Sequence, residues 1–180
     1  LMPARKDALV PAAIMIELAE TLARNSGSPD TVATVGICDV HPSAINSIPR
    51  TVTISFDVRD TDLETRERIV AALKARGAEL AAERELGYEL TLINADPPVT
   101  AADEIRSAIE ASSAQAGLTT NHQVSRAYHD ALFIARKVPT GMIFIPSKDG
   151  ISHRPDEYTA PEEVANGVTV LAATLARLAE

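Results

Sequence analysis

The sequence predicts a mixed α/β chain that is built in two parts. Three observations predict this. Apolar residues recur with a helical period near the start, β-rich segments follow before residue 60, and the pattern begins again after Pro97-Pro98. We therefore expect a first part over residues 1–97 and a second part over residues 98–180.

The first part opens with one helix and two strands. Asp7 to Arg24 carries apolar residues close to a helical period, and the polar run 25–29 stops it. Val32 to Val40 is rich in β-forming residues, and Thr51 to Val58 alternates with a period of two. The proline-bounded turn between these strands predicts an antiparallel pair.

A second helix and a third strand complete the first part. Thr61-Asp62-Leu63-Glu64 fits a capping box for a helix that fades near Gly77 or Gly87, and Tyr88 to Ile93 is a further strand. This order of elements resembles a split βαβ (ferredoxin-like) unit without its first strand. Because such a sheet would expose an edge, we expect the chain to be cut at its start.

The second part begins and ends with a helix. Thr100 is expected to cap a helix to about Ala116, and a short apolar helix spans residues 130–136. The apolar run 141–146 has the length of a buried strand. A capping box at 159–162 begins the last helix. Its expected core face consists of Val164, Val168, Leu171, Leu175 and Leu178.

Composition narrows the class of function. A net charge of −8 and the absence of Trp argue against nucleic acid as a partner, since that affinity rests on clustered Lys and Arg and on aromatic platforms. No apolar run approaches the roughly 20 residues of a membrane-spanning helix. We expect a cytoplasmic protein with no membrane partner. Cys38 is the single cysteine, which excludes an internal disulfide, and we interpret it as strand filler.

Two histidines stand where chemistry is expected. His153 lies in a polar loop after the predicted strand 141–146, and it is a metal ligand, a general base or an ordinary loop histidine. His129 precedes Asp130, which fits either a cleft histidine beside a helix cap or no site at all. A hydrolase triad through Ser125 or Ser152 is disfavoured, because neither serine lies in a G-x-S-x-G elbow.

Asn46 and Arg59 each allow a structural and a functional interpretation. Asn46 lies in the turn between the strands, where asparagine is common for conformational reasons alone. Arg59 ends the second strand between acidic residues and forms either a surface ion pair or a clamp for a substrate carboxylate.

Five segments carry a recognisable combined pattern, namely Met2–Ala8, Pro42–Pro49, Phe56–Asp60, Ser125–Ala131 and Met142–Tyr158. Together they resemble one family, the hydantoinase/carbamoylase branch of the M20 metallopeptidase-like amidohydrolases. That branch includes N-carbamoyl-amino-acid, allantoate and ureidoglycolate amidohydrolases. The resemblance covers nearly the whole chain, in order.

The resemblance implies the carboxy-terminal portion of a two-domain enzyme. Residues 1–97 match a ferredoxin-like lid (dimerisation) domain lacking its first strand, and residues 98–180 match the last segment of an α/β metallo-amidohydrolase catalytic domain. The full-length enzyme is expected to bind two divalent metals, Zn or Mn, per subunit and to cleave a linear C–N bond by metal-activated water. We expect the metals to be absent from this fragment.

The resemblance also implies residue roles. His153 matches a metal ligand. Asn46 and Arg59 match lid residues that reach a substrate carboxylate across a homodimer, and Tyr128 and His129 match positions beside the substrate. The family's catalytic glutamate precedes this stretch, so we expect no catalytic residue here and an inactive fragment.

Departures from the family pattern indicate the substrate class. Ser43 and Arg50 replace a usual Asn and Gly, and Arg126 and Tyr128 replace two glycines beside the substrate. The resulting Ser-Arg-Ala-Tyr-His-Asp resembles plant-type ureidoglycolate amidohydrolases, which favours a small ureido acid over a bulky N-carbamoyl amino acid. The alternative is a non-catalytic dimerisation module. A peptidase of the wider clan is disfavoured by the Asn46 and Arg59 motifs.

Overall fold

The computed structural model describes residues 1–179. The chain divides into two compact units, one over Leu1–Pro98 and one that begins at Val99. In chain order the elements are η1 (Met2–Ala4), α1 (Leu9–Arg24), β1 (Val32–His41), β2 (Thr51–Arg59), α2 (Leu63–Glu83), α3 (Asp103–Gln115), α4 (Ala131–Ile134), η2 (Lys148–Gly150) and α5 (Pro161–Leu178). Among residues 1–179 no helix combines the length and apolar character needed to cross a bilayer.

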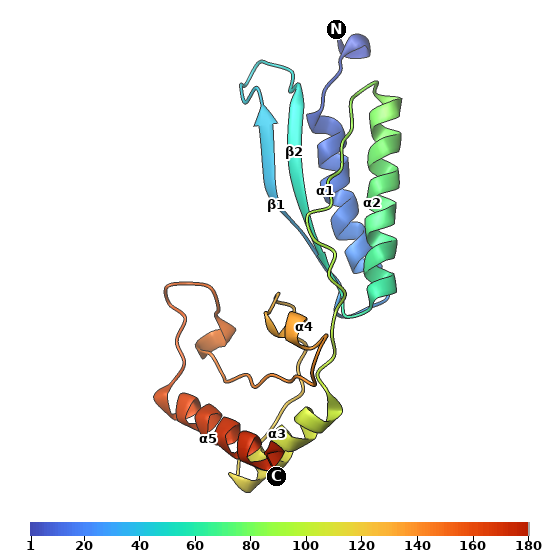
Figure 1. Cartoon of the computed structure of the whole chain (residues 1–180). Coiled ribbons are helices and arrows are strands. Elements are labelled where there is room, and N and C mark those ends of the chain that lie inside the picture. Colours follow the sequence, from blue (N-terminus) through green and yellow to red (C-terminus); the bar gives the residue numbers. More distant parts are fainter. Residues whose placement is uncertain (180) are drawn as a thin grey trace. The chain divides into compact units, whose positions relative to one another are not determined.

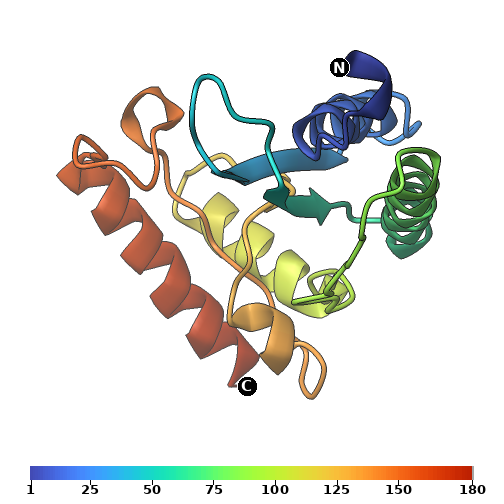
Figure 2. The same ribbon diagram turned by 90° about the horizontal axis from the view of Figure 1, so that it is seen from above.

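The first unit is a hairpin covered by two helices. β1 and β2 pair antiparallel, as predicted, with His41 opposite Thr51 at one end and Val32 opposite Arg59 at the other. The register shifts at an irregularity in β1, just after Thr34. Figures 1 and 2 show α1 and α2 on the same side of this hairpin.

Alternating strand residues explain why the helices cover only one face. A buried cluster lies between helices and hairpin and consists of Met15, Ala19, Ile69, Leu73 and Leu80. Strand residues packed against it are Ala33, Val35, Ile54, Phe56 and Val58. In β2 these residues alternate with Ser55, Asp57 and Arg59, whose side chains therefore lie on the opposite face of the sheet. The first unit thus has a core of its own.

The start of α2 differs from the predicted capping box. Asp62, not Thr61, is the N-cap residue, and its carboxylate accepts a hydrogen bond of 2.9 Å from the backbone N–H of Thr65. Aspartate caps at least as well as threonine, so the helix begins one residue later than the sequence pattern suggested.

The two later capping predictions were also wrong. The N-cap residues of α3 and α5 are Ala102 and Ala160, and neither has a side-chain cap. In α5 the following Pro161 occupies the first turn, where its missing N–H costs nothing.

The predicted strand over Tyr88–Ile93 is not a strand in the structure. These residues belong to no ladder, because the sheet of the described residues contains only β1 and β2. Apolar alternation makes a strand only where a neighbouring strand supplies hydrogen bonds. α2 also continues past Gly77 to Glu83, and the ring of Tyr88 lies against Gly77.

The second unit is built on α3 and α5, which pack against each other. Its buried residues are mostly small, namely Ala108, Ser112, Ser113, Val170 and Thr174. The predicted buried strand 141–146 is instead an unpaired segment with Phe144 52% exposed, for want of a neighbouring strand among the described residues. Ile145 lies against Gly167 of α5, so close that a Cβ there would stand 2.6 Å from its side chain.

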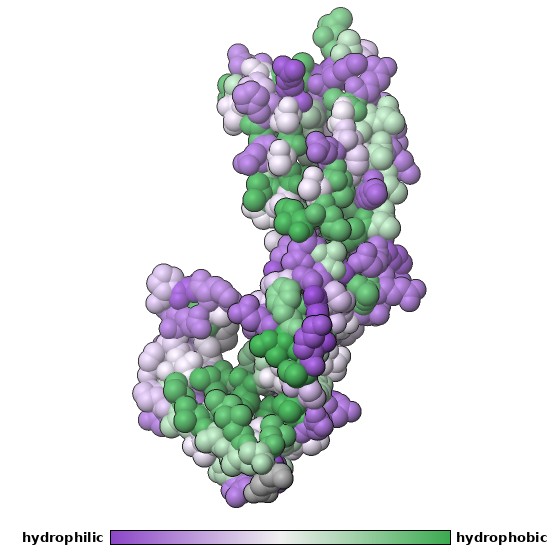
Figure 3. Space-filling model, in the orientation of Figure 1, coloured by the Kyte–Doolittle hydropathy of each residue, from purple (hydrophilic) through white to green (hydrophobic). Residues whose placement is uncertain are grey.

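The predicted core face of α5 was wrong as well. Val170 and Thr174 are the buried residues of this helix. The five residues expected inside are 44–61% exposed, and Figure 3 shows apolar surface gathered over this unit. The helix is amphipathic as expected, but the described residues provide nothing to cover its broader apolar stripe.

Candidate functional site

Arg59 is held by a neighbouring carboxylate. Its Nε donates to Oδ1 of Asp57 at 2.8 Å, and its Nη2 donates to Oδ2 at 2.5 Å. The hydrogen bond from Arg59 lowers the pKa of Asp57, and the bond to Asp57 raises the pKa of Arg59. Both side chains lie on the face of the hairpin opposite α1 and α2 and are about half exposed, at 43% for Arg59 and 52% for Asp57. The guanidinium is therefore charged and oriented.

Asn46 lies at the other end of the hairpin. It is exposed in the turn between β1 and β2, beside Ile45, whose side chain is fully exposed. The nine residues of β2 advance about 3.3 Å each, so the turn and Arg59 are separated by about 26 Å of strand. Asn46 and Arg59 of one chain therefore cannot bind the same small carboxylate.

His129 is held by two contacts in the second unit. Its Nε2 lies 2.5 Å from Oγ of Ser125, and its ring meets that of Phe144 edge-on, with centroids 6.1 Å apart. The ring is partly buried. No carboxylate contacts this imidazole in the described part of the chain, so Ser125 and His129 do not form a triad with an acid.

Tyr128 stands on the same short segment. Its ring packs edge-on against Phe133 at 5.8 Å, and the guanidinium of Arg136 lies 5.1 Å from the Phe133 centroid on the face of that ring. Tyr128 is 50% exposed. The segment thus combines an imidazole with a phenol hydroxyl, two groups that donate and accept hydrogen bonds to a polar substrate.

The loop that carries His153 is closed on itself. The backbone N–H of Lys148 donates to the carbonyl of Tyr158 at 2.8 Å, and the N–H of His153 donates to Oε2 of Glu157 at 2.8 Å. His153 has a φ of 59° and is exposed, and its Nδ1 lies 3.1 Å from Oγ of Ser152. Glu157 thus holds the backbone of His153 within this loop.

The described residues do not form a metal site by themselves. Over positions 1–179, His, Cys, Asp and Glu nowhere gather in a group of three or more that could hold an ion. His153 could supply one imidazole, whereas a catalytic zinc needs three protein ligands. No chemical step through a metal can be derived from these residues.

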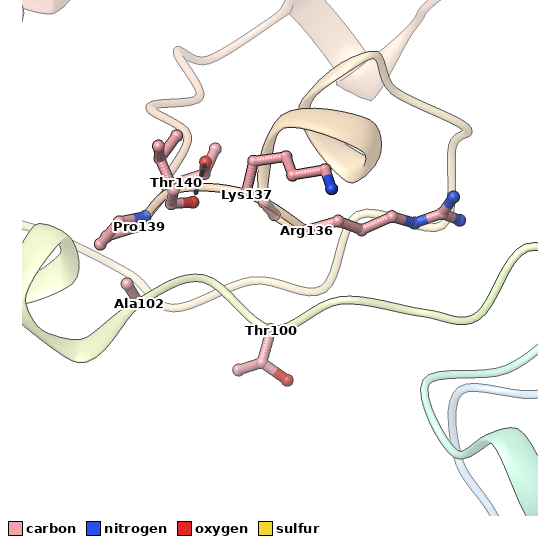
Figure 4. A pocket seen from close by; sticks show the side chains of 8 residues that line it. Thr100, Ala102, Arg136, Lys137, Pro139 and Thr140 are labelled. Atoms are coloured by element: carbon pink, nitrogen blue, oxygen red, sulfur yellow. Dashed lines mark hydrogen bonds between the residues drawn. The ribbon is translucent and has the colours of Figure 1, made fainter.

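A shallow, open hollow of about 270 Å³ in the second unit lies away from these residues. It is lined by residues 135–140, which follow α4, and by Thr100 and Ala102, which lead into α3. Figure 4 shows Arg136 and Lys137 on one side of it and Ala102 on the other. None of the predicted site residues lines this open hollow, and we do not assign it to the candidate site.

The interpretation of Arg59 as a surface ion pair with a flanking acid is borne out, and Asp57 is that acid. The sequence did not predict the contact of Phe144 with His129 or that of Glu157 with the backbone of His153. Nothing in the sequence pairs Phe144 with His129, which are separated by α4 and the segment that follows it.

One family model and several known proteins match nearly the whole chain. Peptidase family M20/M25/M40 matches residues 7–177. The ureidoglycolate hydrolase of Oryza sativa subsp. japonica is 46% identical over 99% of this chain and 37% of its own length. The N-carbamoyl-L-amino acid amidohydrolase of Geobacillus stearothermophilus is 35% identical over 99% of this chain and 43% of its own length.

Solved structures agree with these matches. The crystal structure of AtUAH in complex with glyoxylate superimposes with a TM-score of 0.91 at 41% identity, over 99% of this chain and 42% of that one. The chain therefore has the mixed α/β fold of amidohydrolase structures and spans about two fifths of the length of the relatives it matches.

Proposed function

Since the chain belongs to peptidase family M20/M25/M40, we propose that it is part of a hydrolase that cleaves a linear amide-type C–N bond of a small ureido acid. One observation carries the proposal, the 46% identity to a ureidoglycolate hydrolase over 99% of the chain. The identity to an N-carbamoyl-amino-acid enzyme is lower, at 35% over the same share. A ureido acid of the size of ureidoglycolate is therefore the preferred substrate.

The site residues suit such a substrate. Arg59 offers a charged, oriented guanidinium, which is the natural partner of a carboxylate. Tyr128 and His129 offer a hydroxyl and an imidazole for the polar ureido group and the substrate hydroxyl. The bulk of Arg126 and Tyr128 narrows the space beside them relative to glycine, which disfavours long side chains on the substrate.

The remaining chemistry requires residues beyond this stretch. We propose that His153 contributes one ligand to a divalent metal, Zn or Mn, and that the other ligands and the proton-transferring carboxylate come from the rest of the full-length protein. Residues 1–97 act in this proposal as a lid, and residues 98–180 as part of a catalytic domain. The small core of the second unit supports this division. The 180-residue chain alone should be inactive.

A second copy of the chain is part of the proposal. Asn46 and Arg59 lie at opposite ends of the hairpin, and the exposed Ile45 beside Asn46 suits burial against another surface. If both polar side chains contact one substrate, two copies must each supply one of them. We therefore propose a homodimer whose lid turn reaches the partner's site, with the two copies related by a twofold axis.

The test is made on the full-length protein. Ammonia release from ureidoglycolate should exceed that from N-carbamoyl amino acids and dipeptides, and should be lost on chelation and restored by Zn²⁺ or Mn²⁺. Arg59→Ala should raise KM about 10- to 150-fold, because a charge-assisted hydrogen bond contributes about 1.5–3 kcal/mol. Arg24→Ala, which breaks the Arg24–Glu20 pair on α1, is the control and should leave KM unchanged. Preferred cleavage of a dipeptide would contradict the proposal.

A further inference from the structure

Asp57 binds Arg59 through two hydrogen bonds that fix the orientation of the guanidinium. The two side chains are two residues apart on β2 and share the face of the hairpin opposite α1 and α2. Each carboxylate oxygen of Asp57 accepts from a different nitrogen of Arg59, Nε at 2.8 Å and Nη2 at 2.5 Å. Two parallel hydrogen bonds between planar groups hold the guanidinium in the plane of the carboxylate, which a single bond does not.

Other ion pairs of the first unit lack this geometry. Arg24 directs both Nε and Nη2 at one oxygen of Glu20, and Arg76 uses Nη1 for both Glu79 and Glu83. Those contacts leave the guanidinium plane free to turn about the shared atom. Arg154 and Asp156 of the second unit form the same fork, through Nε at 2.9 Å and Nη2 at 2.7 Å, so the fork orients the guanidinium of Arg59 without by itself marking a substrate site.

We infer that Asp57 is a positioning residue for substrate recognition, which holds the Nε–Nη2 edge of Arg59 and so fixes the plane in which the guanidinium meets a substrate carboxylate. The inference rests on the proposed function of Arg59 as the carboxylate partner. It assigns to the Asp57 side chain a role in specificity for acids of the ureidoglycolate type.

Charge and geometry act in opposite directions at this pair, and their balance sets the sign of the effect. The negative charge of Asp57 repels an incoming carboxylate, but both side chains are about half exposed, so water screens that repulsion. The restraint on the guanidinium is geometric and is not screened. Because the arginine side chain is ordered before the substrate binds, the entropic cost of ordering it does not weaken binding. Asp57 should therefore strengthen substrate binding.

The experiment compares variants of the full-length enzyme with ureidoglycolate as substrate and glyoxylate as a binding probe. Asp57→Asn, which removes one of the two acceptors, should raise KM and the glyoxylate dissociation constant about two- to tenfold, with kcat almost unchanged. Asp57→Glu keeps a carboxylate and should recover part of the affinity. Glu20→Gln, at the unforked pair on α1, should change neither constant. Circular dichroism melting verifies that each variant is folded.

The Arg59→Ala variant distinguishes a failure of the Asp57 role from a failure of the proposed contact between Arg59 and substrate. In that background Asp57→Asn should have no further effect, since there is no guanidinium left to orient. If Arg59→Ala raises KM and Asp57→Asn does not, the role of Asp57 is wrong and the proposed function stands. An equal effect of Asp57→Asn in both backgrounds also overturns the inference. If Arg59→Ala changes neither KM nor glyoxylate binding, the proposed contact and the inference fail together.

Discussion

At the scale of the residue, Asp60 shows how a single carboxylate fastens the first unit. It is 9% exposed and accepts hydrogen bonds from Oγ of Ser28 at 3.2 Å, from Oγ1 of Thr31 and from the N–H of Asp62 at 2.8 Å. The end of β2 is thereby joined to the loop before β1 and to the start of α2. Burial alone would raise the pKa of Asp60, but the bonds from Thr31, Asp62 and Ser28 outweigh it and lower the pKa.

Asp60→Asn should therefore destabilise the protein by about 1.5–3 kcal/mol at pH 7, because a charged acceptor of several hydrogen bonds is lost. The chain has no Trp, so urea unfolding is best followed by far-UV circular dichroism. Asp39→Asn, at an exposed position of β1, is the matched control and should change stability by no more than about 0.5 kcal/mol. Equal effects of the two substitutions would contradict a special role for Asp60.

The lowered pKa of Asp60 also predicts a pH dependence with a definite sign. A carboxyl group whose pKa is lower in the folded than in the unfolded protein stabilises the fold fully at pH values above its unfolded pKa, here 3.8. This stabilisation is lost as the pH falls through the folded pKa. The stability difference between wild type and Asp60→Asn should thus be constant from pH 7 to about pH 5 and shrink below about pH 4. Unfolding curves at pH 7, 5 and 3 measure it. A difference that grows on acidification would reverse the sign and refute this account.

At the scale of the element, α2 illustrates how a neighbouring segment decides whether a glycine is tolerated. Gly77 lies inside the helix, where glycine ordinarily costs about 1 kcal/mol relative to alanine. Here a Cβ would stand 2.6 Å from the hydroxyl oxygen of Tyr88 and 2.7 Å from its ring. The missing side chain lets the segment after α2 lie against the helix, and burial there raises the pKa of Tyr88.

Gly77→Ala should therefore not give the stabilisation that replacing a helical glycine with alanine usually brings. It should destabilise the chain by about 1 kcal/mol, because the cost of overpacking against Tyr88 exceeds the gain in helix propensity. In a Tyr88→Ala background the same substitution should stabilise by about 1 kcal/mol, since the obstacle is gone. Thermal or urea unfolding of the four proteins in this double-mutant cycle gives the coupling. Stabilisation by Gly77→Ala in the presence of Tyr88 would show that the ring simply moves aside.

At the scale of the whole molecule, the two units differ in how much apolar surface they cover. All the large aliphatic side chains that are less than 4% exposed, Ile69, Leu73 and Leu80, belong to the first unit. The second unit buries small residues and leaves Val168, Leu171 and Leu175 of α5 exposed at 61, 49 and 59%. Contiguous exposed apolar surface of this kind marks an interaction site or a tendency to associate.

The 180-residue chain should therefore self-associate through α5. Replacing Val168, Leu171 and Leu175 together with Ser, Gln and Gln should reduce the species larger than a dimer, as measured by light scattering at micromolar concentration, and should reduce binding of a hydrophobic dye. The control replaces three exposed isoleucines of the first unit, Ile37, Ile45 and Ile48. Those changes should leave association through α5 intact. Loss of association in the control alone would place the contact on the first unit.

The proposed dimer makes a prediction for the full-length enzyme. Asn46→Ala and Arg59→Ala should each impair activity at low substrate concentration. After subunit exchange in an equal mixture, about half of the dimers are mixed and each contains one intact site, so about a quarter of the wild-type activity should return. Asn46→Ala mixed with itself is the control. Activity that does not return on mixing would mean that one chain supplies both residues or that Asn46 has no role.

Local patterns were sufficient for much of the fold. The helical period before Asn25, the alternation from Thr51 to Val58 and the breaks between them depend only on neighbouring residues, so α1, β1, β2 and their antiparallel pairing could be predicted from sequence. The segments 88–93 and 141–146 were predicted as strands and are not. A β-rich pattern shows only that a segment can pair, and the partner strand has to come from elsewhere.

The amino-acid sequence by itself thus determined the first helix, the antiparallel strand pair and the helix after it, the family resemblance and the identity of the candidate residues Asn46, Arg59 and His129. Only the tertiary structure decided what each one touches. It set Asp57 against Arg59 and Ser125 against His129, put Asn46 at the far end of the hairpin, and left the predicted core face of α5 uncovered. The physical reason is that periodicity reports which residues share a face, whereas contacts depend on how separate segments pack in three dimensions.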